Sequence, residues 1–364
     1  MILATPPGEA NGLRTCTLSY RTEVHVSDTV RWDRVARGLE RDNFRMIWKP
    51  YGLPEIIDPS GSAFHDGQVH PPWDVPEKIV IQTAITGAFF TRQANPNQPQ
   101  TTSEILSAAR ACAAAGSSAI HIHVRDDRGY NTLSVERFEE VVLPLREEFP
   151  GLSIDGCYVC ALAGEWEQMK IALDRKILDA VPVNPTAVFN GDALFAKPVP
   201  MLLEKTRLIL EGGARPIIAV YTDADVDNAS RFLFASDLLG AGQAWCILPA
   251  LPGCSPMNNP LQMVAGLLRI VAAIRDVDPQ ARILVCAAGR ASSYLVTLAT
   301  TLGLHIRVGM EDTVWRWPHR DQKLASNLEA FEAARDVASL LGREVASFAE
   351  YREIFGVPEL APAV

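Results

Sequence analysis

After residue 76 the chain alternates between short apolar runs and longer amphipathic stretches. The runs are rich in β-branched residues and nearly continuous in hydrophobicity, which predicts strands of a parallel sheet covered on both faces. Each run precedes a stretch with helical periodicity. We count eight such pairs, at 78–85 and 101–116, 118–124 and 134–149, 152–159 and 165–176, 178–184 and 200–213, 215–222 and 227–240, 244–251 and 260–276, 281–289 and 292–303, and 304–311 and 321–342.

Eight strand–helix pairs in about 270 residues predict a closed (β/α)8 (TIM) barrel, an α/β fold that usually takes about 250 residues. A doubly wound open sheet is the alternative. Its first strand–helix turn normally carries a glycine fingerprint for a dinucleotide, which residues 86–99 lack. Residues 1–75 are irregular and rich in proline, so we predict an N-terminal extension, an arm packed on the body or on a neighbouring subunit, and a catalytic barrel at 76–364.

Composition narrows the class of protein. The 364 residues are 48% hydrophobic and carry a formal net charge of −9 without a basic block, which disfavours nucleic acid and anionic membranes as partners. No apolar stretch approaches the roughly 20 residues that cross a bilayer, and the start lacks the features of a secretion signal. Seven scattered cysteines suit a reducing compartment, so we expect a cytoplasmic protein.

The strand at 118–124 carries two histidines, His121 and His123, followed by Arg125. Residues two apart on a strand share a face, so both rings point the same way and can converge on one Zn²⁺. The alternative is a pair of core histidines bonded to backbone or carboxylate groups. At the carboxyl end of a barrel strand, where reactive groups gather, the spacing favours a metal.

A third ligand is expected at the end of the last strand, in the sequence "HIRVGMEDT". Arg307 and Glu311 share parity there, and Asp312 follows in the loop. Glu311 can complete a site of two histidines and one carboxylate, while Arg307 pairs with Asp312 or binds an anionic substrate. The alternative is a helix N-cap at Asp312 or Thr313, with Glu311 solvated.

Weaker signals lie elsewhere in the chain. Gly253 and Arg290 stand in loops after the sixth and seventh strands, where backbone N–H groups can hold phosphate or carboxylate oxygens. Cys157 and Cys160 have CxxC spacing, but without a second pair we discount a structural zinc or redox site. We expect His305 in the core or behind the site, and His319 at the surface.

Four segments in this order resemble the beta-keto acid cleavage enzymes: "IQTAITGAFFTRQANPNQPQTTSEI", "AIHIHVRDDRG", "LPALPGCSP" and "HIRVGMEDT". The resemblance covers residues 78–357. It implies a zinc-dependent TIM barrel, a homo-oligomer, that reacts a beta-keto acid with acetyl-CoA to give acetoacetate and a new acyl-CoA. His121, His123 and Glu311 would bind zinc (or another divalent metal), and Asp312, polarised by Arg307, would be the general base.

Departures from the family pattern concern the substrate pocket. Phe89 stands where a glutamate holds an amino group, which implies an uncharged or apolar substrate tail. Cys157 lies near the position of a hydroxyl residue, Pro182 replaces a threonine, and Ala219 aligns with an acid. Substrate contacts are expected at Thr86, Phe89, Arg125, Asn184, Gly253 and Arg290.

Two other classes of function, a different metal-dependent enzyme and a non-catalytic binding protein, remain open from the residues alone. One is a metal-dependent hydrolase or aldolase on the same barrel, although this chain offers few further histidines for such a site. An iron oxygenase uses the same ligand types but on an all-β fold. The other class is a zinc-bearing barrel that binds a small acid or CoA without turnover.

Overall fold

Eight parallel strands form a closed barrel in the computed structural model, which describes residues 72–358 except 161, 191–192 and 252–253, and residues 30, 31, 33, 34 and 37. Neighbours around the barrel follow chain order, and the last strand, β13, closes it against the first, β2. The strands are β2 (Ile81–Ala84), β3 (Ala119–Ile122), β6 (Ser153–Gly156), β7 (Ala180–Val183), β10 (Arg215–Val220), β11 (Ala244–Ile247), β12 (Arg282–Cys286) and β13 (His305–Val308).

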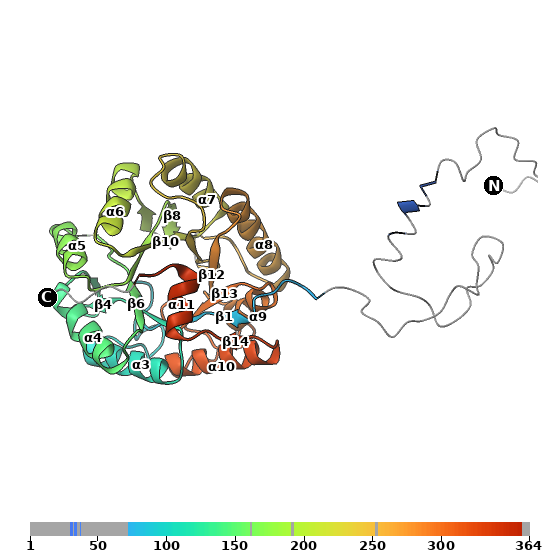
Figure 1. Ribbon diagram of the computed structural model, residues 1–364. Helices are drawn as coiled ribbons and strands as arrows, with labels where there is room; N and C mark the ends of the chain where they lie inside the picture. The colour runs from blue at the N-terminus through green and yellow to red at the C-terminus, as the bar shows by residue number, and fades with distance from the viewer. Residues whose placement is uncertain are drawn as a thin grey trace, which may run out of the picture. The chain divides into compact units, whose positions relative to one another are not determined.

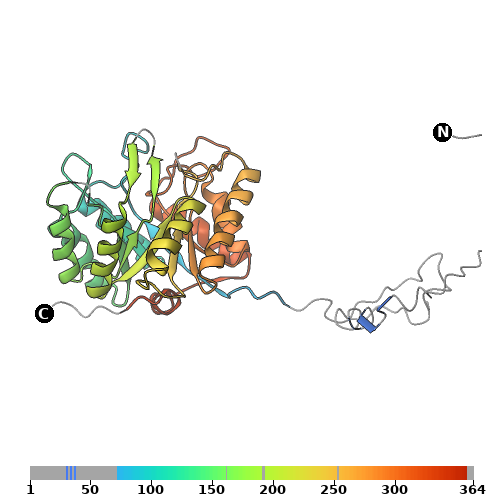
Figure 2. The same cartoon turned by 90° about the horizontal axis from the view of Figure 1, so that it is seen from above.

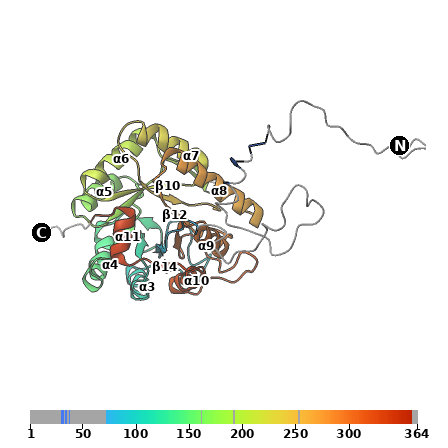
Figure 3. The ribbon, with the colours of Figure 1, turned by 45° about the vertical axis from the view of Figure 1, so that its right-hand side comes forward.

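A helix follows each strand, and Figures 1 and 3 show these helices around the outside of the barrel. This arrangement confirms the predicted (β/α)8 fold and excludes the open sheet. The helices are α3 (Thr102–Ala114), α4 (Val135–Glu148), α5 (Glu165–Asp174), α6 (Val199–Glu211), α7 (Asp223–Ala229) continued by the π-helix η2 (Ser230–Phe234), α8 (Pro260–Val277), α9 (Ser292–Thr301) and α10 (Asn327–Leu340).

Several helices begin where a side chain caps the free backbone N–H groups of the first turn. Thr101 and Glu104 form a capping box at the start of α3, and Ser134, Asn259 and Ser326 cap α4, α8 and α10. The caps fix where each strand–helix loop ends. Because α10 begins only after Ser326, the alternative of a helix cap at Asp312 or Thr313 is wrong.

The core has two layers. One lies between strands and helices and includes Ile120, Ile122 and Phe138, all with 0% exposed surface. The other fills the barrel interior and includes Ala219 and Leu284. Alternate residues of each strand therefore face opposite layers, as the nearly continuous apolar runs require.

Helix α11 (Phe348–Phe355) crosses the amino-terminal end of the barrel (Figure 1). Its buried Tyr351 and Phe355 belong to the same apolar cluster as Ala119 and Ala180, the first residues of β3 and β7. The short parallel pair β1 (Lys78–Ile79) and β14 (Glu344–Val345) lies beside it. This end is therefore closed by apolar packing, which leaves the opposite end for chemistry.

Two antiparallel hairpins interrupt the strand–helix alternation. β4 (Val124–Arg125) pairs with β5 (Asn131–Thr132) after β3, and β8 (Ala187–Asn190) pairs with β9 (Ala193–Ala196) after β7. Figure 2 shows the β8–β9 hairpin on the opposite side of the barrel from α11. Both hairpins follow carboxyl ends of strands, the end at which TIM barrels place their sites.

The chain divides into two compact units, Met1–Asp74 and Val75–Val364. The second unit contains the whole barrel. Most of the first unit lies outside the described residues, so the interpretation of residues 1–75 as an arm stays a prediction. None of the helices in the described part of the chain combines the length and the apolar character that crossing a bilayer demands.

Candidate metal and catalytic site

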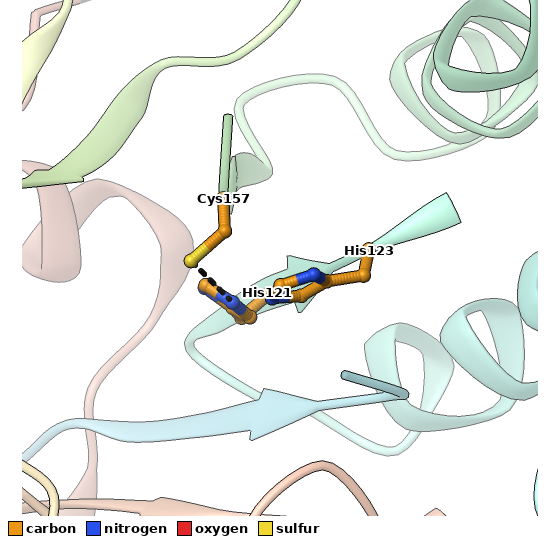
Figure 4. A group of neighbouring side chains, drawn as sticks. All are labelled: His121, His123 and Cys157. Atoms are coloured by element: carbon orange, nitrogen blue, oxygen red, sulfur yellow. Dashed lines mark hydrogen bonds between the residues drawn. The ribbon is translucent and has the colours of Figure 1, made fainter. Parts of the chain in front are cut away.

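The two histidines of the predicted pair lie side by side at the carboxyl end of β3. His121 is within the strand and His123 directly follows it, with ring centroids 5.5 Å apart (Figure 4). Both are buried. His121 Nδ1 donates to Asp155 Oδ1 at 2.9 Å, and His123 Nδ1 donates to Asn131 Oδ1 at 2.5 Å. The Nδ1 partners fix both rings and leave each Nε2 for another contact.

Glu311 lies directly opposite these Nε2 atoms. Its Oε2 is 3.1 Å from His121 Nε2, and its Oε1 is 3.4 Å from His123 Nε2. Two glycines let the carboxylate reach this place. Gly309 has φ +135°, and a Cβ there would lie 2.1 Å from the Ala84 carbonyl oxygen; a Cβ at Gly87 would lie 2.2 Å from Glu311 Cγ. The loops after β2 and β13 therefore approach each other closely at this carboxylate.

Arg307 and Asp312 form a buried ion pair beside Glu311. The Nε of Arg307 donates to Asp312 Oδ2 at 2.9 Å and its Nη2 donates to Oδ1 at 2.5 Å. The same Nη2 donates to Glu311 Oε1 at 3.2 Å. The bidentate contact fixes the plane of the Asp312 carboxylate. One guanidinium thus orients both acidic residues of the motif.

Charge controls protonation in this buried cluster. Burial would lower the pKa of both histidines, but Glu311 and Asp155 raise the pKa of His121 well above its usual range, and Glu311 and Cys157 raise that of His123 to about 10. Burial opposes ionisation of Glu311, yet Arg307 and the histidines hold its pKa well below its ordinary value. The field at the Nε2 atoms therefore favours positive charge, as a cation site requires.

Asp312 behaves differently from Glu311. Burial raises the pKa of its carboxyl group above the ordinary value, although Arg307 acts in the opposite direction. Arg307 therefore does lower this pKa, but the desolvation of a carboxylate with 0% exposed surface outweighs the pairing, so the net shift is upward. A more basic carboxylate is better suited to take a proton from carbon.

The donor set fits a divalent metal ion. His123 Nε2 and Glu311 Oε2 are buried and make no hydrogen bond. Buried polar atoms without a hydrogen bond are costly even where they face an opposite charge, as Glu311 Oε2 faces His121 Nε2 at 3.1 Å, and a shared ion would satisfy both atoms at once. With the Nδ1 atoms occupied by a carboxylate and an amide, the rings also have the outer partners that metal-binding histidines usually have.

Cys157 joins this cluster, which the sequence analysis did not predict. Its Sγ lies 3.9 Å from His121 Nε2, and the ligand atoms of His121, His123 and Cys157 all lie within 4.8 Å of one another (Figure 4). Burial would raise the pKa of this thiol, but the two rings lower it to about 6. Cys160 points elsewhere, with Sγ 3.8 Å from the Glu165 carbonyl oxygen, so the two cysteines form no joint site.

Asp155 was also missed. It pairs in register with His121 across β3 and β6, and its Oδ2 accepts from Gln82 Nε2 at 3.0 Å. The sequence held one signal for it. Asp155 and Cys157 are two residues apart on one strand and therefore share a face, and Asp155 is the neighbour of His121 on the adjoining strand. A polar residue in an otherwise apolar strand marks such a position.

Thr86 and Arg125 were expected to bind substrate, and the structure places both in a network that holds the loop after β2. Arg125 donates to Thr86 Oγ1 at 2.8 Å and to the carbonyl oxygens of Gly87 and Phe90. Thr86 Oγ1 also accepts from Gln98 Nε2 at 2.9 Å. Both side chains are buried and already bonded within the protein.

The other predicted substrate residues lie in three further loops. Phe89 is partly buried and packs against the apolar cluster of the barrel interior. Asn184 directly follows β7 and is half-buried. Arg290 is exposed, pairs with Asp321 at 2.8 Å and lies over the Trp315 ring. Gly253 lies outside the described residues.

The remaining sequence candidates occupy structural positions. Pro182 is a buried residue of β7, and Ala219 lies in β10 with 2% exposed surface. His305 begins β13 at the closed end, where its Nδ1 accepts from the Val80 N–H at 3.1 Å, so its predicted place in the core is confirmed. His319 is exposed beside Tyr294, as expected for the surface.

Comparison with known proteins agrees with this geometry. A family model described as beta-keto acid cleavage enzyme matches residues 78–357. The 3-keto-5-aminohexanoate cleavage enzyme of Acetoanaerobium sticklandii is 29% identical over 77% of this chain and 99% of its own length. The 3-oxoadipate:acetyl-CoA acetyltransferase of Cupriavidus necator is 25% identical over 78% of this chain and 96% of its own.

A solved structure supports the fold. The binary complex of ObcA with oxaloacetate aligns with a TM-score of 0.63 and 19% identity, over 72% of this chain and 68% of that chain. At this level of identity the likeness concerns the barrel alone. The matched family region contains every residue of the histidine–carboxylate cluster.

Proposed function

The chain belongs to the beta-keto acid cleavage enzyme family, and we propose that it transfers the acyl part of a beta-keto acid to the CoA of acetyl-CoA, releasing acetoacetate. It is thus an enzyme that breaks a carbon–carbon bond. The observation that carries the proposal is the convergence of His121, His123 and Glu311 beside the ion pair of Arg307 and Asp312. These are the metal-ligand and base positions that the family resemblance assigns.

His121, His123 and Glu311 would hold a divalent metal, which we propose to be Zn²⁺ because two imidazoles and a carboxylate form a usual catalytic zinc set. When bound, the ion supplies Lewis acidity for the oxygens of the keto acid. Asp155 and Asn131 keep the histidine rings oriented through their Nδ1 atoms. The chain's own contribution is therefore a rigid set of ligands.

Asp312 is the proposed base. It would take a proton from the carbon between the two carbonyl groups, and that carbon would attack the thioester carbonyl of acetyl-CoA and expel the CoA thiolate. The thiolate would then attack the substrate's original keto carbonyl, and the bond from that carbonyl to the newly acetylated carbon would break. This gives the new acyl-CoA, and the acetoacetate carbanion recovers the proton from Asp312. Arg307 holds the carboxylate in the required plane throughout.

We propose a substrate with an uncharged or apolar tail. Phe89 supports this because it lies in the loop after β2 and packs on the apolar interior cluster. Asn184, at the end of β7, is a proposed polar contact, and Gly253 and Arg290 are kept as proposed contacts for the acidic or CoA part. Thr86 and Arg125 would act by holding the Phe89 loop in place.

The experiment is release of acetoacetate from a panel of beta-keto acids with acetyl-CoA, with and without a chelator. The panel should contain apolar, cationic and anionic tails. We expect turnover of an apolar member, loss on chelation, restoration by Zn²⁺, and about one zinc per chain in the purified protein. Binding of keto acids without acetoacetate would favour the alternative of a non-catalytic binding protein, and the absence of metal would contradict the proposal.

We also propose a homo-oligomer of cytoplasmic location. Leu261, Val264 and Leu268 lie on one face of α8 with 79%, 36% and 44% of their surface exposed, and an apolar stripe of this kind suits a contact between copies. The six cysteines within the described residues are free thiols, which supports a reducing compartment.

A further inference from the structure

We propose that Cys157 is a fourth protein ligand of the metal, so that this chain's site combines two imidazoles, one carboxylate and one thiolate. The inference rests on the proposed metal site but not on the proposed reaction. It assigns a specific role to a position at which the chain departs from the family pattern. It also predicts a metal selectivity that the histidines and Glu311 alone would not give.

The donor atoms lie close enough together to share one metal ion, and an oxygen of the keto acid would then take a fifth position on it. With bonds of about 2.0–2.3 Å to nitrogen, oxygen and sulfur, neighbouring ligand atoms lie roughly 3.3–3.6 Å apart. The separations are 3.1 Å and 3.4 Å from the histidine Nε2 atoms to Glu311, and 3.9 Å from His121 Nε2 to Cys157 Sγ. The two contacts to Glu311 are near these values, and the Cys157 thiol would reach the same ion by a small movement toward His121.

The backbone directs Cys157 toward the histidines. Gly156 precedes it, and a Cβ at that glycine would lie 2.4 Å from the Ile122 carbonyl oxygen. Only a glycine lets the end of β6 approach β3 so closely. On the other side, the Nζ of the buried Lys205 donates to the Tyr158 carbonyl oxygen at 2.9 Å and fixes the loop. The backbone on both sides of Cys157 is thus held in place.

A second observation points to a ligand independently of the cysteine. His123 Nε2 and Glu311 Oε2 are buried and make no hydrogen bond, and His123 belongs with Cys157 to one group of donor atoms within 4.8 Å of one another. An imidazole nitrogen, a carboxylate oxygen and a thiol sulfur lie close together, and one shared proton cannot give all three a hydrogen-bond partner. Soft sulfur beside imidazole nitrogen favours Zn²⁺, Co²⁺ and Cd²⁺ over Mg²⁺ and Mn²⁺.

The test is to load the metal-free full-length protein with Co²⁺ and record its absorption spectrum. We expect a thiolate-to-cobalt charge-transfer band in the near ultraviolet together with visible bands of a low-symmetry site. Cys157→Ser should lose the ultraviolet band, keep the visible bands and bind Zn²⁺ at least about tenfold more weakly. Cys160→Ser is the matched control, since its thiol points away from the site, and should keep the band.

X-ray absorption of the zinc-loaded wild-type protein needs no variant and should show sulfur at about 2.3 Å from the metal. Visible cobalt bands without the charge-transfer band, or zinc spectra without sulfur, would overturn the inference and leave the proposed reaction intact. A sulfur ligand in a protein that never releases acetoacetate would confirm the inference and contradict the reaction.

Discussion

Each reactive side chain in this site has a second residue that fixes its position. Asp155 holds His121 through Nδ1, and Arg307 holds Asp312 through two hydrogen bonds. Fixed partners reduce the entropy lost when a substrate reaches the reacting geometry. They also set protonation, because the groups are buried and respond strongly to neighbouring charges. Both the reacting group and its partner are therefore open to test by substitution.

Asp312→Asn removes the proposed base and keeps the shape of the side chain. We expect turnover to fall by about 10²–10⁴-fold, the usual contribution of general base catalysis. The zinc content should not change, because all the proposed metal ligands stay in place. Steady-state acetoacetate release and metal analysis of the same sample check both statements. A variant with near wild-type turnover would rule out Asp312 as the base.

Asp155→Asn removes the negative charge behind His121 but keeps an acceptor for Nδ1. Loss of such an outer partner typically costs about 10–100-fold in metal affinity, and we expect a loss in this range. Competition with a chromophoric chelator measures it. Asp127→Asn is the control, because the Asp127 side chain is 91% exposed. If both variants bind zinc equally well, Asp155 has no orienting role.

The sequence could predict residues whose spacing itself carries geometry. The two-residue period of a strand predicts that His121 and His123 share a face. The position of Glu311 and Asp312 at the carboxyl end of the last strand predicts that they lie at the site. Cys157 could not be assigned in this way, because its role depends on the distance between β3 and β6. Gly156 permits the close approach of these strands, and the hydrogen bond from Lys205 holds the loop after β6, neither of which a single sequence reveals.

At the scale of elements, the two ends of the barrel differ in chemistry. The carboxyl ends of β3, β6 and β13 carry charged groups and the proposed metal ligands, whereas the amino end is filled by α11. The sequence predicted all eight strand–helix pairs, since each has its own periodicity. It did not predict the β8–β9 hairpin, the π-helix or α11, because these short segments depend on packing and not on a repeating pattern.

His305 gives the closed end a pH dependence. Its Nδ1 accepts from Val80 N–H, and burial together with Arg343 lowers its pKa to about 3. Since the unfolded pKa is about 6.5, the unfolded chain binds more protons between these values. Stability is therefore present above pH 6.5 and is lost as the pH falls toward 3, by at most about 1.4 kcal/mol per pH unit.

His305→Asn tests this dependence, since asparagine offers an acceptor to Val80 N–H without titrating. We expect the wild-type advantage in the free energy of unfolding, measured in urea, to shrink from pH 7 to pH 4. Wild type and variant share all other titratable groups, so the contribution of those groups to the pH dependence cancels in the comparison. A difference that stays constant over this range would show that His305 does not titrate as the structure implies.

At the scale of the whole molecule, the barrel carries the site and the family match, while the first 74 residues form a separate unit. All the candidate ligands and the base lie between residues 121 and 312. Deletion of residues 1–71 should leave zinc content, thermal unfolding and the kcat of acetoacetate release within about twofold. A metal-free or unfolded product would show that the extension is part of the catalytic unit.

The stripe on α8 makes a prediction about assembly. Its leucines expose 79% and 44% of their surface at positions 261 and 268, on a helix whose opposite face is buried against the barrel. If copies associate through this face, Leu261→Glu with Leu268→Glu places like charges opposite each other and should reduce the mass measured by light scattering to that of one chain. Leu340→Glu is the matched control and should not change this mass, because Leu340 is the last residue of α10 and is 86% exposed. All the proposed metal ligands belong to one chain, so the dissociated variant should still bind about one zinc ion per chain. An unchanged mass would place the contact on another face.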